Sequence, residues 1–401
     1  MKKRFVMTTL ALMLLTAAVT YGMAFYMSKQ SYETKIGELN KRSEQYAKIA
    51  EVQGYIDKYY VNEYDEKSVT DGAAAGMVAY LGDKWSYYLT ADQFADLNES
   101  LNNKLVGIGV NVAYDVDSGG ILVYELFPDT PAEESGLLPM DVIYEVDGIA
   151  VSELGYDAAV NKVRGEEGTA VKLSVYREAT QEYLTFNVTR ENVQIEAISS
   201  QILTGSIGYV KIRNFDLNVD KSFAEAIANL QKTKVKAIVF DVRNNPGGAL
   251  QSLVACLDIL LPETELISAV DKAGEKTVYK SDAKFIDLPM AVITNEHSIS
   301  AAEFFAASLQ EHGKAEVVGM PTTGKGCSQV PIQLKDGSGI MLSTQKYYTA
   351  KGISLAETGG IVPDHKVELT KEEQTRFYKL TQAEDRQLQT AVDLVKSKIP
   401  A

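Results

Sequence analysis

The chain has 401 residues, and its 40 Lys and Arg against 54 Asp and Glu give a formal net charge of −14 at pH 7. A chain this acidic lacks the clustered cations that nucleic-acid binding requires, so no nucleic-acid partner is expected. Two cysteines and three histidines are too few for a disulfide scaffold, a cysteine zinc site or a His-rich metal site, and no cofactor is expected. With 45% hydrophobic and 23% charged residues, the chain should be globular and contain about two to three domains.

The first 27 residues have the pattern of a membrane segment. Three basic residues, 2–4, precede an uncharged stretch, 5–27, which is long enough as a helix to cross a hydrocarbon core of about 30 Å. The basic flank should stay in the cytoplasm. We therefore predict an uncleaved single-pass anchor in the cell membrane, with the rest of the chain outside the cytoplasm. A cleaved signal peptide is the alternative, because Gly22-Met23-Ala24 offers small residues at a cleavage-like spacing.

The rest of the chain divides into four regions that differ in their residue patterns. Residues 28–103 are polar and predicted to be mostly helical, whereas 104–190 consist of short β runs separated by turns. Residues 191–370 alternate strand-like and helical segments, which predicts a layered α/β domain. The last segment, 371–401, carries apolar residues at helical spacing and should form an amphipathic closing helix. The fold class is therefore α/β, within an α+β multidomain chain.

A glycine-rich loop after a predicted strand could be mistaken for a nucleotide site. Gly319–Gly326 nearly matches the phosphate loop Gly-x4-Gly-Lys-Ser/Thr, but Gly326 has no hydroxyl for Mg²⁺. The residues that follow, 327–334, have an extended pattern and do not open a helix. We therefore reject a nucleotide-dependent enzyme.

Ser300 stands where a predicted strand gives way to a helix that begins at Ala301. A serine at such a turn can act as a nucleophile, because the unpaired N–H groups of the first helical turn can hold an oxyanion. As an isolated feature, however, Ser298 or Ser300 would more commonly be a simple helix cap.

A serine nucleophile needs a base, and Lys325 is a candidate. At an unperturbed pKa of about 10.4 only about one lysine in 2,500 is neutral at pH 7, and burial lowers the pKa. The other interpretation is a solvated loop lysine. The turn 243–248, after an apolar strand, could add backbone oxyanion donors or be a turn only.

Motifs along most of the chain resemble those of the carboxyl-terminal processing peptidases, also called tail-specific proteases. The module 104–190 is similar to the PDZ domain of that family, and 191–370 would then be its crotonase-like peptidase domain. The motifs are Trp85–Leu89, Ile207–Ile212, Asp241–Gly248, Asn295–Glu303, Gly324–Gly326 with Gln329, Gly360–Asp364 and Asp385–Ala391.

The resemblance implies a Ser–Lys serine endopeptidase that acts through an acyl-enzyme. Its implied site consists of the nucleophile Ser300, the general base Lys325, the lysine-orienting Gln329, and the oxyanion donors Gly247 or Gly248 and Ala301. Around the nucleophile the chain departs from the family, because His297 and Ile299 replace a glycine and an alanine. We do not expect His297 to be a catalytic base. An inactive scaffold that only tethers partners is the competing hypothesis.

The PDZ-like module also has an implied role. Gly107-Ile108-Gly109-Val110 resembles the family's carboxylate-binding loop, which would capture protein or peptide substrates with accessible C-termini as an added strand. Without the family context it is a strand with glycines that could form a bulge. Arg164 lies in a loop that resembles the family's Arg-Gly-Pro-x-Gly-Thr, with Glu166 in place of proline, and is a candidate regulatory contact. The terminal helical segments could support a homodimer.

Overall fold

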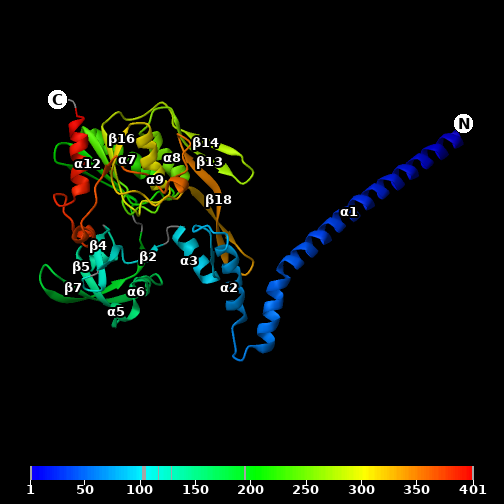
Figure 1. Ribbon diagram of the computed structural model, residues 1–401, viewed down its shortest axis with the longest axis horizontal. Helices are drawn as coiled ribbons and strands as arrows, with labels where there is room; N and C mark the ends of the chain where they lie inside the picture. Colours follow the sequence, from blue (N-terminus) through cyan, green and yellow to red (C-terminus); the bar gives the residue numbers. More distant parts are fainter. Residues whose placement is uncertain (1, 102–104, 116, 128, 194–195, 400–401) are drawn as a thin grey trace. The chain divides into compact units, whose positions relative to one another are not determined.

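The computed structural model describes the chain except for residues 1, 102–104, 116, 128, 194–195 and 400–401 (Figure 1). It divides into two compact units, Met1–Gly72 and Ala73–Ala401. The second unit contains a PDZ-like module, a layered α/β domain and the C-terminal segment. The α/β multidomain class predicted from the sequence is therefore confirmed.

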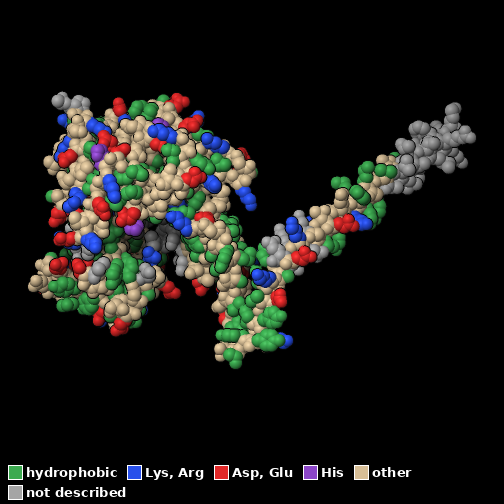
Figure 2. All heavy atoms as spheres, viewed as in Figure 1, with side chains coloured by type: hydrophobic (Ala, Val, Ile, Leu, Met, Phe, Trp, Pro, Cys, Tyr) green, Lys and Arg blue, Asp and Glu red, His purple; other side chains and the backbone are tan. Residues whose placement is uncertain are grey.

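The N-terminal unit is dominated by one helix, α1 (Lys2–Tyr59), whose sequence contains no proline to interrupt it. Within the described residues, no helix is apolar over enough length to cross a membrane. About half of the predicted anchor, 5–27, falls on positions whose side chains lie outside the described set (Figure 2, grey). Helix α2 (Glu66–Ala79) begins after Asp65, whose carboxylate accepts a hydrogen bond of 2.8 Å from the Ser68 N–H.

The PDZ-like module is a twisted antiparallel sheet closed by short helices. Its strands alternate inward and outward side chains, and Ile121, Ile143 and Val175 are fully buried between the sheet and α6. The sheet order is β3 (Val110–Asp115), β4 (Gly120–Leu126), β5 (Asp141–Val146), β7 (Ala170–Arg177) and β8 (Glu182–Thr189), with β6 (Ile149–Ala150) beside β5, and the helices are α4 (Pro131–Glu134), α5 (Val151–Leu154) and α6 (Tyr156–Val163). A separate pair, β2 (Leu105–Gly107) and β9 (Glu191–Val193), joins the two ends of the module.

The layered α/β domain is built on a six-stranded sheet, parallel from β11 to β19, with helices on both faces. Alternate residues of β12, such as Phe240 and Val239, pack into two different hydrophobic clusters, one with α7, α8 and α9 and one with α12. The strand order is β10 (Ile198–Leu203), β11 (Ile207–Ile212), β12 (Ala237–Asp241), β15 (Met290–Thr294), β16 (Ala315–Gly319) and β19 (His365–Lys366). The helices are α7 (Val219–Lys232), α8 (Leu250–Asp258), α9 (Ala301–Glu311) and α12 (Arg386–Ser397).

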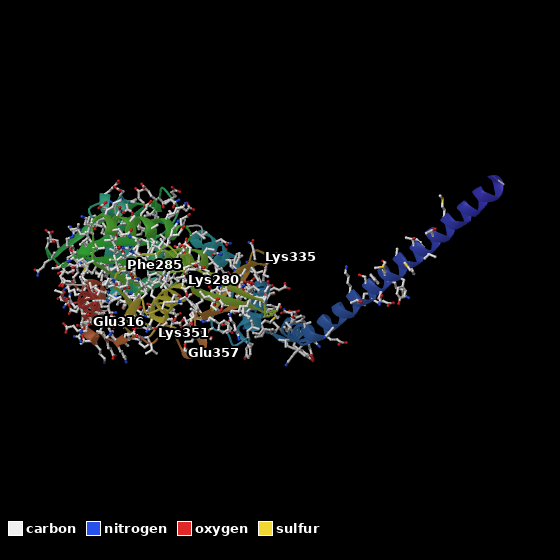
Figure 3. The ribbon with its side chains drawn as sticks, turned by 90° about the horizontal axis from the view of Figure 1, so that it is seen from above. Lys280, Phe285, Glu316, Lys335, Lys351 and Glu357 are labelled. Carbon is white, nitrogen blue, oxygen red and sulfur yellow. The ribbon has the colours of Figure 1, made fainter. Side chains whose placement is uncertain are left out.

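A second sheet includes the two strands that follow the loop 320–326 in the chain. It contains β13 (Glu265–Asp271), β14 (Lys276–Lys280), β17 (Cys327–Gln333), β18 (Gly339–Thr349) and, from far upstream, β1 (Tyr87–Leu89). Figure 3 labels Lys335 in the connection between β17 and β18, and Glu316 on β16 beside the C-terminal helix, where Lys398 lies 2.5 Å from its carboxylate. The remaining helices are α3 (Ala91–Leu101), α10 (Leu355–Thr358), α11 (Lys371–Thr375) and the 3-10 turn η1 (Phe377–Lys379).

Candidate active site

Ser300 stands at the sharp turn between the end of β15 and the start of α9. Its backbone adopts φ 55° and ψ −115°, a region that side-chain-bearing residues rarely occupy. Such a conformation persists only where neighbouring groups hold it, and it is concentrated at functional sites. Hydrogen bonds around the turn hold Ser300 in this conformation.

Those hydrogen bonds come from the buried residues of the same turn and from the loop after β12. Ser298 is fully buried, its hydroxyl donates to the Val242 carbonyl at 2.8 Å, and it accepts from the Asn295 N–H at 3.0 Å. The Ile299 N–H donates to the Asn245 carbonyl at 2.9 Å. Ser298 thus has a structural role, whereas the Ser300 side chain is left at the N-terminus of α9.

The carboxylate of Glu303 joins Ser300 to Lys325. One oxygen accepts from both the Ser300 N–H and the Lys325 N–H, each at 2.8 Å, so these two amide nitrogens are at most twice 2.8 Å, or 5.6 Å, apart. The other oxygen accepts from the Gly324 N–H at 2.7 Å and the Thr322 hydroxyl at 2.5 Å. Glu303 is fully buried, and its two oxygens together accept these four hydrogen bonds. Its role was not predicted from the sequence, although Ser300-x-x-Glu303 has the spacing of a capping box.

The Lys325 side chain is half-buried and held by a neutral partner. Its ammonium donates to the Gln329 carbonyl oxygen, and the Gln329 amide donates to the Trp85 carbonyl. The ammonium also lies 4.7 Å from the centre of the Trp85 ring. Burial lowers the pKa of Lys325, although the charges of Cys327, Glu303 and Asp83 oppose that shift. Among the described residues, no hydrogen bond links the Lys325 ammonium to the Ser300 hydroxyl.

Of the two glycines predicted as oxyanion donors, Gly247 lies directly against Ser300 and Gly248 lies against the Phe215 backbone. A Cβ atom added to Gly247 would come within 2.9 Å of the Ser300 Cβ, so only glycine fits there. The Gly247 N–H already donates to the Asn245 side chain at 2.8 Å. In the described part of the chain, no acceptor meets the N–H of Gly248 or of Ala301, so these two groups are the available donors.

Comparison with known proteins identifies the family. The model of peptidase family S41 matches residues 206–367, that of a PDZ domain 104–189, and that of the activating protease CtpB N-terminal domain 13–93. Carboxy-terminal processing protease CtpA of Bacillus subtilis is 30% identical, with 89% of this chain and 76% of that protein covered. The chain belongs to the carboxyl-terminal processing proteases.

Two further relatives agree with this assignment. CtpB of Bacillus subtilis is 33% identical over 78% of this chain and 66% of its own length. The solved structure of a photosystem II D1 C-terminal processing protease is 28% identical, with a TM-score of 0.51 over 79% of this chain and 85% of that one. The protein is accordingly a PDZ-containing serine peptidase.

The predicted tail-binding loop of the protease connects β2 to β3. Gly107 ends β2 and Val110 begins β3, while Ile108 is buried and its carbonyl accepts from the Ala132 N–H at 2.8 Å. Gly109 has φ 86°, and a Cβ atom there would lie 2.3 Å from the Thr130 side chain. The loop shape is thus fixed by contacts on its carbonyl side. No described residue accepts from the N–H groups of Ile108 and Gly109, which can face a ligand.

Two further residues singled out in the sequence have exposed side chains. Arg164 is the C-cap residue of α6, and His297 lies within the turn before Ser300. Lys325 lies in a loop that runs into strand β17, so the phosphate-loop resemblance ends without a helix. Among the described residues, no group of three His, Cys, Asp or Glu side chains could hold a metal ion. Trp85, quoted only as part of a motif, is the contact that sequence reasoning missed.

Proposed function

We propose that this protease cleaves peptide bonds by a Ser–Lys mechanism, with Ser300 as nucleophile, Lys325 as general base and Gln329 as the residue that orients the lysine. The observation that carries the proposal is the shared Glu303 oxygen, which holds the Ser300 and Lys325 backbones within 5.6 Å of each other. The lowered pKa of Lys325 makes a neutral amine accessible nearer to neutral pH.

The chemistry follows from these groups. Neutral Lys325 takes the hydroxyl proton as the Ser300 oxygen attacks the carbonyl carbon of the scissile bond, and the oxyanion lies against the N–H groups of Gly248 and Ala301. The protonated lysine returns the proton to the departing amine, which leaves an acyl-enzyme. Water, deprotonated by the same lysine, then attacks the acyl carbonyl, and the lysine returns that proton to the departing Ser300 oxygen as the acyl product is released.

The test is cleavage of an unfolded protein by purified variants. We expect Ser300→Ala and Lys325→Ala to abolish cleavage while the circular dichroism spectrum and the thermal midpoint are retained. Ser328→Ala and Lys346→Ala, on neighbouring strands β17 and β18, are matched controls that should keep wild-type turnover. Wild-type turnover in Ser300→Ala or Lys325→Ala would refute the Ser–Lys assignment.

We also propose that the PDZ-like module recognises substrate C-termini through Gly107–Val110. The support is the pair of loop N–H groups described above, which suit a carboxylate, and the open edge of β3, which pairs only with β4 among the described strands. A substrate with an apolar C-terminal residue should be cleaved faster than the same substrate with an amidated C-terminus. Equal rates for the two substrates would contradict tail recognition.

Anchoring in the cell membrane by residues 5–27, with the peptidase outside the cytoplasm, remains a proposal from the sequence. A full-length chain should sediment with membranes and resist extraction by alkaline carbonate, whereas a chain that begins at residue 28 should not. A mature N-terminus near residue 24 would show a cleaved signal peptide instead. Self-association is a separate proposal, and light scattering of the region after the anchor would show a mass near twice that of one chain.

A further inference from the structure

The PDZ-like module meets the rest of its unit beside a cavity of about 900 Å³, which Tyr124, Asn244, Tyr378 and Arg213 help to line. Because this junction is not filled by side chains, the few groups that bridge it dominate the interaction. Two bridges start from adjacent residues of strand β4, at Tyr124 and Glu125.

The Glu125 bridge is an ion pair. The Arg213 guanidinium donates to both carboxylate oxygens of Glu125, one of them at 3.1 Å from Nε. The same carboxylate accepts from the Asn111 amide at 2.8 Å. Asn111 follows directly after Val110, the last residue of the proposed tail-binding loop, so this bridge begins one residue from that loop.

The Tyr124 bridge is an aromatic stack that reaches the Ser300 turn. The Tyr124 and Tyr378 rings are 3.8 Å apart between centroids with an interplanar angle of 12°. The Tyr378 hydroxyl accepts from the Asn244 amide at 3.0 Å. Burial raises the pKa of both tyrosines, so both hydroxyls stay protonated over the working range of pH.

Asn244 in turn is locked to the residue that begins the Ser300 turn. The Asn244 side-chain oxygen Oδ1 accepts from the Asn295 side-chain amide at 2.7 Å. The Asn244 backbone N–H donates to the Asn295 side-chain oxygen Oδ1 at 2.9 Å. Asn244 has φ 59°, a backbone that needs such fixed partners. The next residue, Asn245, binds the N–H groups of Gly247 and Ile299. A shift of Asn244 would therefore move the Ser300 turn together with residues 243–248, which we call the oxyanion loop.

We infer that Tyr378 is a positioning residue, which sets the oxyanion loop according to where the PDZ-like module lies. This inference rests on the proposed Ser–Lys function. With the Tyr124 stack in place, the Tyr378 hydroxyl holds Asn244, and Asn244 holds the turn before Ser300. When the module moves away, Tyr378 loses its stacking surface and Asn244 loses a fixed acceptor. The contact thus links the tail-binding module to the geometry of the oxyanion hole without touching the substrate.

The experiment compares Tyr378→Phe, which keeps the ring and removes the hydroxyl, with wild type and with Tyr183→Phe, an exposed tyrosine of β8 as matched control. We expect Tyr378→Phe to lower kcat about fivefold, the effect of one neutral hydrogen bond, with KM within about twofold. Hydrogen exchange of residues 243–249 and 295–300 should become faster, and the thermal midpoint should stay at the wild-type value. Tyr183→Phe should match wild type in every measurement.

A second variant makes the link to the module testable. Tyr124→Leu removes the stack while it keeps an apolar side chain, and it should lower kcat as well. The double variant with Tyr378→Phe should lose less than the product of the two single losses, because both act on one contact. Wild-type kcat in Tyr378→Phe, unchanged exchange at 243–249, or strictly multiplicative losses would each overturn the inference. If wild type itself shows no Ser300-dependent cleavage, the proposed function fails, while the exchange experiment still decides the Tyr378 link.

Discussion

Two lysines of the peptidase domain are withdrawn from water, and they differ in the group that each ammonium contacts. Lys211 on β11 lies 3.2 Å from the Asp241 carboxylate and donates to the Arg243 carbonyl at 3.0 Å. Lys325 instead donates to the neutral amide of Gln329. Burial lowers the pKa of both, but only Lys211 has a carboxylate as its direct partner to retain the proton. The two sites therefore differ in whether a carboxylate directly contacts the ammonium and favours its charged form.

The surroundings of Lys211 explain why that region is structural. Arg243 is buried and donates to the carboxylates of Asp241 and Asp385, both at 2.7 Å from Nη2, which ties β12 to the cap of α12. Burial alone would raise the pKa of Asp241, but Arg243 and Lys211 outweigh it and hold that pKa well below its usual value. Each of these four charged side chains has an oppositely charged partner, so the cluster has a structural role.

The largest expected effect separates the two lysines by activity. Lys325→Met should lower kcat/KM by about 10³-fold, within the range that a general base contributes, and leave the free energy of unfolding unchanged or slightly higher. Lys211→Met should retain measurable cleavage but lower the free energy of unfolding, because Asp241 would then have only Arg243 as a cationic partner among the described residues. Turnover assays with urea unfolding of both variants measure the two effects. Equal activity losses in the two variants would remove the distinction.

The second effect concerns stability. Arg243→Met leaves Asp241 and Asp385 buried without their shared cation, and it should lower the free energy of unfolding by about 3–5 kcal/mol. Urea denaturation followed by circular dichroism measures this loss. Arg386→Met, which removes an exposed pair with Glu373 next to the same helix, is the matched control and should cost less than about 1 kcal/mol. A loss no larger than that of the control would mean that the cluster is not structural.

A third variant makes the Lys325 site resemble the Lys211 site. Gln329→Glu places a carboxylate beside the ammonium and should raise the pKa of Lys325, which shifts the acid limb of the kcat/KM profile to higher pH by at least about one unit. Activity near pH 7 should fall about tenfold and partly recover at alkaline pH. An unshifted profile with uniformly lower activity would show that Gln329 does not control the lysine proton.

The smallest expected effect is on stability as a function of pH. Because the folded pKa of Lys325 lies below its unfolded value of 10.5, the unfolded chain binds more protons between those two values. Wild type should therefore gain stability relative to Lys325→Met as pH rises through that window, and lose it again as pH falls. The difference in thermal midpoint between the two proteins, measured from neutral to alkaline pH, gives the sign. If the wild type instead lost stability relative to Lys325→Met as pH rises, the pKa of Lys325 would not be lowered in the folded protein.

Local sequence patterns predict only part of the candidate site. The strand before Ser300, the helix after it and the glycines at 247–248 follow from apolar runs and from residue types that suit turns. Glu303 was within the quoted motif, yet its role requires knowing that residues 322–325 return to the start of α9. Trp85 is 244 residues from Gln329, and nothing in either local pattern indicates that they meet.

The amino-acid sequence by itself determined the element types and the α/β class, because hydrophobic periodicity and turn chemistry act over a few residues. The candidate nucleophile and base came from the resemblance to the carboxyl-terminal processing peptidases. Only the tertiary structure decided which lysine faces a neutral amide, which oxyanion N–H groups remain available, and that Tyr378 joins β4 to Asn244. Those outcomes depend on burial and on contacts made across the fold, such as that between Tyr378 and Asn244, which are 134 residues apart in the chain, and hydrophobic periodicity does not encode them.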